Sequence, residues 1–277
     1  MNAKVVLDGL VLGESPRWHD GRLWVADWAA HELITLDADG TRHIAERPAS
    51  IPCCIDWLPD GRLLLVSSDR LLRREADGSM VTHAELAQLD PHPWNDIAVD
   101  SHGNVFVGCI GFDFPAGEYA PGIIAVITPD GVARTAAADL AFPNGMVVTP
   151  DDATLIVAES YGSRLTAFDI GAGGALSNRR VWAGLGEDHP DGICLDAEGA
   201  VWAADVGSKH CVRVREGGQV LQTVDADRGC FACTLGGADG RTLYIVTAQW
   251  PNDFRTPTGQ VLAVQVTVPS ARTATAG

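Results

Sequence analysis

A short polar turn followed by an apolar strand recurs six times along the chain, and this repeat limits the folds that the chain can adopt. The middle residues of the six turns are Asp20, Asp60, His102, Asp151, Glu198 and Asp239. Successive turns are 40, 42, 49, 47 and 41 residues apart. Repeats of about 40 to 50 residues are typical of β-propellers, in which each repeat buries its apolar faces against its neighbours.

A second series of turns alternates with the first and defines the repeating unit. Each of its turns follows a third apolar segment, and the series consists of Asp39-Gly40, Asp77-Gly78, Asp130-Gly131, Gly173-Gly174 and Gly217-Gly218. Asp-Gly and Gly-Gly favour tight hairpins, because these turns need positive φ angles. The sequence therefore predicts an all-β fold, a six-bladed β-propeller with four antiparallel strands per blade. The alternative is a β-sandwich in which the regular spacing is accidental.

The last repeat is short of one strand. After Asp239-Gly240 only two apolar segments remain, 243–247 and 260–266, whereas segment 4–8 belongs to no hairpin of its own. We expect this N-terminal segment to supply the outer strand of the last blade and close the ring. Residues 1–268 are accordingly predicted to form a single domain. Residues 269–277 are small and polar, and we expect a flexible C-terminal tail.

Charge and composition exclude several classes of protein. Asp and Glu number 36 against 20 Lys and Arg, a formal net charge of −16, which repels nucleic acid and anionic membrane surfaces. No apolar run approaches the ~20 residues of a membrane helix. Residues 1–11 do not resemble a signal peptide, and seven cysteines is an odd number. We expect a cytoplasmic protein with reduced, buried thiols, including Cys53-Cys54 and the Cys230–Cys233 pair, and no nucleic-acid or membrane partner. Its oligomeric state is left open.

The first strand of each blade lines the channel of a propeller, so residues at one phase of the repeat converge there. The residues six or seven positions before the middle residue of each turn are Glu14, Cys54, Asn95, Asn144, Asp191 and Cys233. Four of these side chains bear oxygen, two of them are anionic, and none is Lys or Arg. Such a set suits a hard divalent cation. The alternative is that Asn144-Gly145 and Asp191-Gly192 are ordinary turn pairs.

The same stretches resemble a known family. The motifs are Leu12-Gly13-Glu14-Ser15-Pro16, Trp94-Asn95-Asp96, Phe142-Pro143-Asn144-Gly145-Met146 and Pro190-Asp191-Gly192. They are similar to the four metal-site motifs of the gluconolactonase / senescence-marker-protein (regucalcin) / luciferin-regenerating-enzyme family. This resemblance implies a propeller with one divalent metal ion (calcium, zinc, magnesium or manganese) and usually hydrolysis of a lactone. It also implies that Glu14, Asn144 and Asp191 bind the metal, with Asn95 at or near the metal and substrate.

Lactone hydrolysis needs a polarised carbonyl, an activated water and a proton acceptor. By the resemblance, Asp191 is the catalytic carboxylate, acting either as general base or as nucleophile. Asn95 is expected to assist as a hydrogen-bond donor to the developing oxyanion. His92 and His189, shortly before Asn95 and Asp191, are candidate proton shuttles.

The sequence departs from the sugar-lactone pattern of the family. An Arg often found two residues before the Asn of the Trp-Asn motif is here Pro93, and the loop 111–115 has one acid, Asp113, between Phe112 and Phe114. The candidate substrate-binding residues are Trp94, Phe112, Asp113, Phe114 and Tyr161, with Tyr119 and Phe142 as further rim candidates. We therefore expect a less hydroxylated lactone or ester as the small-molecule substrate. The alternative is that these aromatic side chains belong to the core.

Two other functions are compatible with the residues. An organophosphate or phosphotriester hydrolase resembling diisopropyl fluorophosphatase would use the same pattern of two Asn, one Glu and one Asp. A non-catalytic propeller that binds calcium and a partner is the second alternative. Four protein ligands leave room for water or substrate on the metal, which favours an enzyme.

Overall fold

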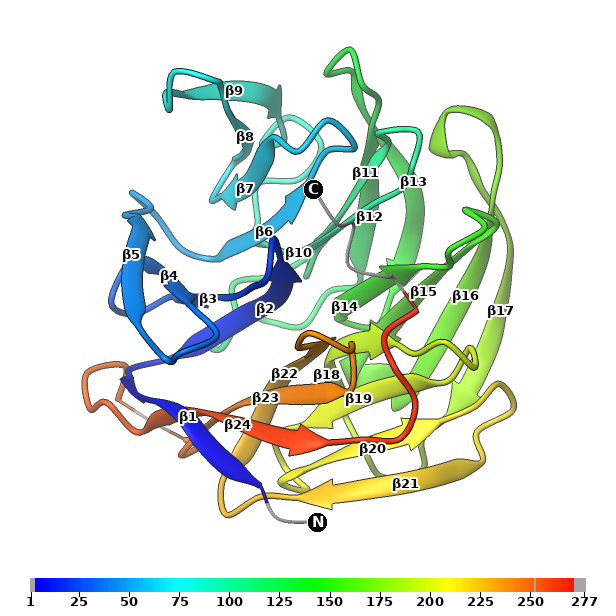
Figure 1. Ribbon diagram of the computed structural model, residues 1–277. Coiled ribbons are helices and arrows are strands. Elements are labelled where there is room, and N and C mark those ends of the chain that lie inside the picture. Colours follow the sequence, from blue (N-terminus) through cyan, green and yellow to red (C-terminus); the bar gives the residue numbers. More distant parts are fainter. Residues whose placement is uncertain (1–2, 252, 272–277) are drawn as a thin grey trace.

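The fold is a ring of six sheets around a central channel. The structure, a computed structural model, describes residues 3–251 and 253–271. In this part of the chain, six four-stranded antiparallel sheets form the blades, and their outermost strands lie at the periphery in Figure 1. The predicted six-bladed β-propeller is confirmed. Helical structure in the described residues is limited to short 3-10 turns, η1 (Ser160–Gly162) and η2 (Ala172–Gly174), and none of their helices is long and apolar enough to cross a membrane.

The blades follow one another along the chain, and we number them in this order. Blade 1 contains β2 (Gly13–His19), β3 (Arg22–Asp27), β4 (Glu32–Leu36) and β5 (Arg42–Glu46). Blade 2 contains β6 (Cys53–Trp57), β7 (Leu63–Ser67), β8 (Arg70–Arg74) and β9 (Met80–Glu85). Blade 3 contains β10 (Trp94–Val99), β11 (Val105–Cys109), β12 (Gly122–Ile127) and β13 (Ala133–Leu140).

The remaining three blades complete the ring. Blade 4 contains β14 (Pro143–Val148), β15 (Thr154–Glu159), β16 (Arg164–Ile170) and β17 (Leu176–Gly184). Blade 5 contains β18 (Pro190–Leu195), β19 (Val201–Asp205), β20 (His210–Val214) and β21 (Val220–Asp225). Blade 6 contains β22 (Gly229–Gly236), β23 (Thr242–Ala248), β24 (Gly259–Gln265) and the N-terminal strand β1 (Lys4–Leu10).

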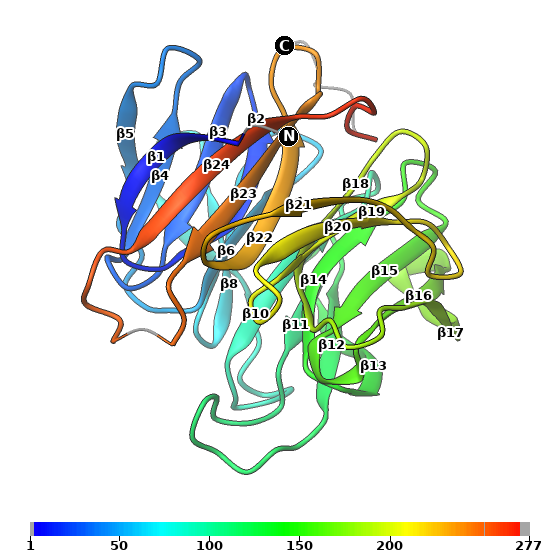
Figure 2. The same ribbon diagram turned by 90° about the horizontal axis from the view of Figure 1, so that it is seen from below.

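The N-terminal strand closes the ring as predicted. β1 pairs antiparallel with β24, with Lys4 opposite Ala263 and Asp8 opposite Gln260, and Figure 2 shows the two strands side by side. The first and last strands of the described chain thus share one sheet. This pairing joins blade 6 to the beginning of the chain by backbone hydrogen bonds.

The first series of turns connects the first and second strands of the blades, and the second series connects the third and fourth strands. The turn between β2 and β3 consists of Asp20 and Gly21, whose φ angles are 49° and 72°. Positive φ at both central residues matches the right-handed twist of a two-residue hairpin, which explains the Asp-Gly sequence.

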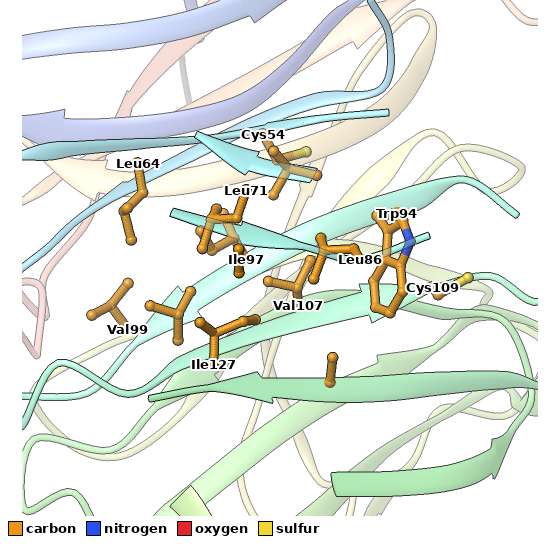
Figure 3. Packing of buried hydrophobic residues seen from close by; sticks show 14 of the residues in the cluster. Cys54, Leu64, Leu71, Leu86, Trp94, Ile97, Val99, Val107, Cys109 and Ile127 are labelled. Atoms are coloured by element: carbon orange, nitrogen blue, oxygen red, sulfur yellow. The ribbon is translucent and has the colours of Figure 1, made fainter. Parts of the chain in front are cut away.

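The hydrophobic core lies between neighbouring blades rather than at a single centre. The largest cluster joins blades 2 and 3, and Figure 3 shows Trp94 within it beside Leu86 and Cys109. Alternate residues of each strand face the blade on either side, so most strands are buried on both faces and are rich in Val, Ile and Leu.

Close approach between inner strands explains two glycines of the family motifs. A Cβ atom on Gly145 would lie 2.5 Å from the backbone nitrogen of Ile193, and one on Gly192 would lie 2.5 Å from the Cβ of Ala232. Both glycines are strand residues, in β14 and β18, and neither has a positive φ. Other residues could therefore adopt their backbone conformation. Glycine is needed for lack of space, because a side chain would push blades 4, 5 and 6 apart.

Part of the segment predicted as a tail is described by the structure. The N–H of Ser270 donates to the carbonyl of Gly240 at 2.9 Å, and the N–H of Ala271 donates to that of Leu195 at 3.1 Å. Pro269 accepts a hydrogen bond from the N–H of Ala197 at 2.8 Å. Residues 269–271 thus rest on the turns of blades 5 and 6, because these turns offer unpaired backbone groups. The rest of the predicted tail, 272–277, lies outside the described residues.

Candidate active site

Four oxygen-bearing side chains meet at one mouth of the channel. Glu14, Asn95, Asn144 and Asp191 are the second residues of the inner strands β2, β10, β14 and β18, and all four line one cavity of about 560 Å³. Cys54 and Cys233, at the same phase on blades 2 and 6, lie just below, next to Glu14, Asn95 and Asn144. The structure therefore brings together all four residues that the sequence proposed as metal ligands.

A backbone irregularity accompanies each of these four residues. The strand pairing shifts register between Glu14 and Arg17, between Trp94 and Ile97, between Pro143 and Met146, and between Pro190 and Ile193. β-Bulges of this kind bend a strand and redirect side chains, and they are frequent next to active sites. In blade 2 the inner strand pairs regularly through Cys54, which contributes no oxygen ligand.

Hydrogen bonds connect the two amides to a serine. Asn95 Nδ2 donates to Asn144 Oδ1 at 3.0 Å, and Asn144 Nδ2 is 3.3 Å from the acceptor Ser160 Oγ. Ser160 Oγ in turn donates to the carbonyl of Pro190 at 2.7 Å, next to Asp191. Ser160 was not among the predicted site residues, although it directly precedes the candidate Tyr161 in the sequence. Its hydroxyl links the ligand-bearing strands of blades 4 and 5.

Carboxyl groups dominate the electrostatics of the channel. Burial raises the pKa of Glu14 to about 8; the Ser15 N–H and the Arg17 guanidinium act against this rise, and the charge of Asp96 adds to it. Burial, together with the charge of Glu14, also raises the pKa of Asp191 well above its usual value. Two carboxyls held close together in this way are costly to ionise without a cation.

The one cation close to these carboxyls in the described channel is already engaged. Arg17 Nη2 lies 3.0 Å from Asp96 Oδ1 and donates to the carbonyl of Ile97 at 3.0 Å. Among the described residues, no three His, Cys, Asp or Glu side chains are grouped so that they could hold a metal ion. A metal at this mouth of the channel would therefore need the amide oxygens of Asn95 and Asn144 in addition to the two carboxylates. The donor set of two carboxylates and two amides, with uncompensated negative charge, fits a hard divalent cation.

Buried acids hold the loops that lead to three of the four candidate ligands. Asp27, at the end of β3, accepts the N–H groups of Val11 and Leu12 at 2.9 and 3.0 Å. Glu159 and Asp205, at the ends of β15 and β19, accept the N–H groups of Ala141 and His189. All three acids are at most 2% exposed. The loops before Glu14, Asn144 and Asp191 are therefore fixed by the adjacent strand of the same blade.

The aromatic candidates divide between the cavity and the core. Phe114 and Tyr161 line the cavity, as do Pro93 and Phe142. Phe112 lies behind them, 4% exposed, with its ring 5.7 Å from that of Phe142.

Trp94 and Asp113 do not line the cavity, contrary to the sequence-based expectation. Trp94 is fully buried between blades 2 and 3, and its Nε1 donates to the carbonyl of Asp90 at 3.3 Å. Asp113 is exposed, and its backbone carbonyl accepts hydrogen bonds from the N–H groups of Ala116 and Gly117. Strand alternation explains Trp94, because its neighbour Asn95 faces the channel.

Several lining residues were missed from the sequence. Blade 6 contributes Phe231, Trp250 and Phe254, and blades 1 and 2 contribute Trp28, Ile51 and Pro52. Phe231 belongs to the inner strand β22, whereas the other residues lie in connections of unequal length, and no repeat phase marked any of them.

The two candidate histidines differ in position. His189 lines the cavity, with Nδ1 2.9 Å from the carbonyl oxygen of Ser160. His92 pairs with Asp90 at 2.7 Å and is not among the described residues that line the cavity. Of the two, His189 alone has access to a bound ligand.

The cysteines are buried thiols. All seven are free, as expected, and the Sγ atoms of Cys194 and Cys233 lie 3.7 Å apart.

Comparison with known proteins identifies the chain's relatives. A family model described as "SMP-30/Gluconolactonase/LRE-like region" matches residues 12–249. The chain is 27% identical to the pentonolactonase XacC of Haloferax volcanii, over 90% of this chain and 86% of that protein. It is 28% identical to the 6-deoxy-6-sulfogluconolactonase of Pseudomonas putida, over 96% and 94%. A solved structure described as the calcium-binding protein regucalcin from Agrobacterium tumefaciens shares the fold, with a TM-score of 0.81, 23% identity and 98% coverage of both chains.

Proposed function

The chain belongs to the SMP-30/Gluconolactonase/LRE-like family, and from this premise we propose that it is a divalent-metal-dependent hydrolase that opens a lactone ring. The observation that carries the proposal is the convergence of Glu14, Asn95, Asn144 and Asp191 on one ligand-sized cavity. The two lactonases among the relatives support the reaction class.

Glu14, Asn144 and Asp191, together with Asn95, would hold the metal. A divalent ion bound there supplies a Lewis acid for the carbonyl and lowers the pKa of water. The relatives named regucalcin support a calcium ion, and the all-oxygen donor set also suits magnesium or manganese. Zinc remains a candidate through the family resemblance.

The chain's own groups have separate tasks in this reaction. Asp191 accepts the proton of the attacking water, or alternatively attacks the lactone carbonyl itself. In the structure Asn95 Nδ2 donates to Asn144 Oδ1. During the reaction the same group donates a hydrogen bond to the developing oxyanion. Ser160 holds the amide of Asn144, and His189 lies at the cavity wall where protons can leave.

The walls of the cavity favour a less hydroxylated substrate. Pro93 offers no donor where sugar-lactone enzymes of the family often have an Arg, and Phe114, Phe142 and Tyr161 surround the mouth with aromatic carbon. A hydroxylated lactone would lose hydrogen bonds to water without gaining equivalent ones here.

Metal removal and replacement tests the proposal. The protein treated with EDTA should lose activity on a panel of γ- and δ-lactones and regain it with calcium, magnesium, manganese or zinc. Turnover of a phosphotriester in preference to every lactone would favour the phosphotriesterase alternative. Tight calcium binding with no hydrolysis of either class would favour a non-catalytic propeller.

We also propose a cytoplasmic location, supported by seven free, buried thiols, and a single domain spanning residues 1–268.

A further inference from the structure

We propose that the substrate is a neutral lactone with a large hydrophobic substituent, and that Phe231, Trp250 and Phe254 bind this substituent. The inference rests on the proposed lactone hydrolysis and extends it to a substrate class. It comes from the size of the cavity, the separation of its polar and apolar parts, and the charges around it.

The cavity is larger than a lactone ring requires. Its volume of about 560 Å³ lies within the range of roughly 300–1,000 Å³ that is usual for sites of drug-sized ligands. An unsubstituted γ- or δ-lactone would leave most of this space to water. Because the space is lined mainly by carbon, a substituent that fills it would release water from apolar surface.

Two aromatic walls face each other across the mouth. Blade 6 supplies Phe231, Trp250 and Phe254, whose rings contact in sequence, with centroids 5.7 and 6.0 Å apart. Blades 3 and 4 supply the opposite wall, which includes Phe114 and Tyr161. Blades 3 and 6 are three positions apart in a ring of six, so the two walls lie on opposite sides of the mouth.

The polar groups gather on the floor between these walls. Glu14, Asn95, Asn144 and Asp191 begin the inner strands, whereas Trp250 and Phe254 lie in the connection between β23 and β24. A lactone with its carbonyl at the floor would therefore direct its substituent towards the walls. Trp250 and Phe254 are 38% and 42% exposed, and such exposed rings at a cavity are typical of ligand-binding surfaces.

The charges favour a neutral substituent. No Lys or Arg is among the described residues that line the cavity, whereas Glu14 and Asp191 both line it. A phosphate, sulfonate or carboxylate on the substituent would lose its hydration against the apolar walls and find no Lys or Arg there to replace it.

The test is a series of γ-lactones with alkyl chains of increasing length, from γ-butyrolactone to γ-dodecalactone, under one metal. We expect kcat/KM to rise by up to about fourfold per added methylene until the cavity is filled. Binding of 5-alkyl-2-pyrrolidinones, which resemble these lactones but resist hydrolysis, should tighten in parallel by calorimetry. A terminal carboxylate on the chain should weaken binding at least tenfold.

Variants test which side chains cause the dependence of kcat/KM on chain length. Trp250→Ala and Phe254→Ala should reduce the dependence on chain length, whereas Phe254→Leu, which keeps an apolar side chain, should retain most of it. Val220→Ala, in the outer strand β21, is the control and should change neither the chain-length dependence nor γ-butyrolactone turnover. Melting temperatures of all variants verify folding.

The outcomes separate the two proposals. If lactones are hydrolysed but chain length has no effect, or the alanine variants keep the full dependence, the hydrophobic substituent is overturned and lactone hydrolysis stands. If the pyrrolidinones bind more tightly with longer chains but no lactone is hydrolysed, the apolar site is supported and lactone hydrolysis is overturned.

Discussion

The carboxylate of Glu159 accepts the backbone N–H of Ala141 at 2.7 Å and so fixes the loop that leads to Asn144. Glu159 is fully buried, and its charge is balanced by Arg164 at 3.0 Å and Arg179 at 3.1 Å. Asp27 and Asp205 occupy the same place in blades 1 and 5. In the blades that carry Glu14, Asn144 and Asp191, a buried acid at the end of the second strand therefore holds the loop before the candidate ligand.

Replacing Glu159 with Gln should destabilise the protein at neutral pH. Removing one partner of a buried, hydrogen-bonded ion pair costs about 3–5 kcal/mol, and Gln retains part of the hydrogen bonding, so we expect a loss of roughly 2–4 kcal/mol. Urea unfolding at pH 7 measures this difference. Glu198→Gln, which removes an exposed carboxylate paired with Arg213, is the matched control and should cost about 1 kcal/mol or less.

The effect of Glu159→Gln should depend on pH. Burial tends to raise the pKa of Glu159, but hydrogen bonds from Arg164, the Ala141 N–H and Thr166 outweigh it and lower that pKa below its usual value. The stabilisation is therefore present above the unfolded pKa of about 4.3 and is lost as the pH falls through the lower folded pKa. The difference between wild type and Glu159→Gln should be full at pH 6 to 7 and shrink below about pH 4. A difference that stays constant down to pH 3 would contradict this account.

Glu14→Gln should stabilise the metal-free protein and abolish its stabilisation by calcium. Because the folded pKa of Glu14 is raised to about 8, its contribution to stability is greatest below the unfolded pKa and is lost as the pH rises towards 8. Scanning fluorimetry in EDTA at pH 7.5 should give a melting temperature several degrees above wild type, at roughly 2–4 °C per kcal/mol. Asp113→Asn, at an exposed position outside the cavity, should behave as wild type. An unchanged calcium response in Glu14→Gln would refute the metal assignment.

Ser160→Ala should weaken metal binding without unfolding the protein. The hydroxyl accepts from Asn144 Nδ2 and donates to the carbonyl of Pro190, so its loss frees the side chain of one proposed ligand and the strand start of another. Loss of such a supporting contact typically lowers metal affinity about 10- to 100-fold. Calorimetric titration with calcium measures the change, with Ser177→Ala on the exposed strand β17 as the control. Equal affinities in the two variants would show that Ser160 does not position Asn144.

Pro93→Arg should shift the substrate preference towards sugar lactones. We expect wild type to have a higher kcat/KM for an aliphatic γ- or δ-lactone than for glucono-δ-lactone, after subtraction of spontaneous hydrolysis. A hydrogen bond to a charged group is worth about 1.5–3 kcal/mol, so Arg at this cavity position should move the ratio by roughly 10- to 150-fold. Pro91→Arg, two residues away at an exposed position, controls for the added charge. A wild-type preference for gluconolactone would mean that residues other than the aromatic walls decide the specificity.

The sequence by itself determined the number of blades, the closure by the N-terminal strand and the four residues at the channel mouth. This was possible because strands alternate with a period of two and the repeat returns each blade to the same radial position, so equal phase along the chain becomes proximity in space. That phase selected six residues, and the oxygen-bearing side chains among them singled out Glu14, Asn95, Asn144 and Asp191 as candidate metal ligands.

Tertiary structure decided which side chains form the walls of the site. Trp94 and Phe231 are both aromatic residues of inner strands, yet Trp94 packs between blades and Phe231 lines the cavity. Trp250 and Phe254 lie far from the ligand motifs in sequence, and they reach the site because the connection between β23 and β24 lies at the same mouth of the channel. The connections that carry them follow no period, so their positions depend on packing across the ring, a long-range property that local sequence patterns do not encode.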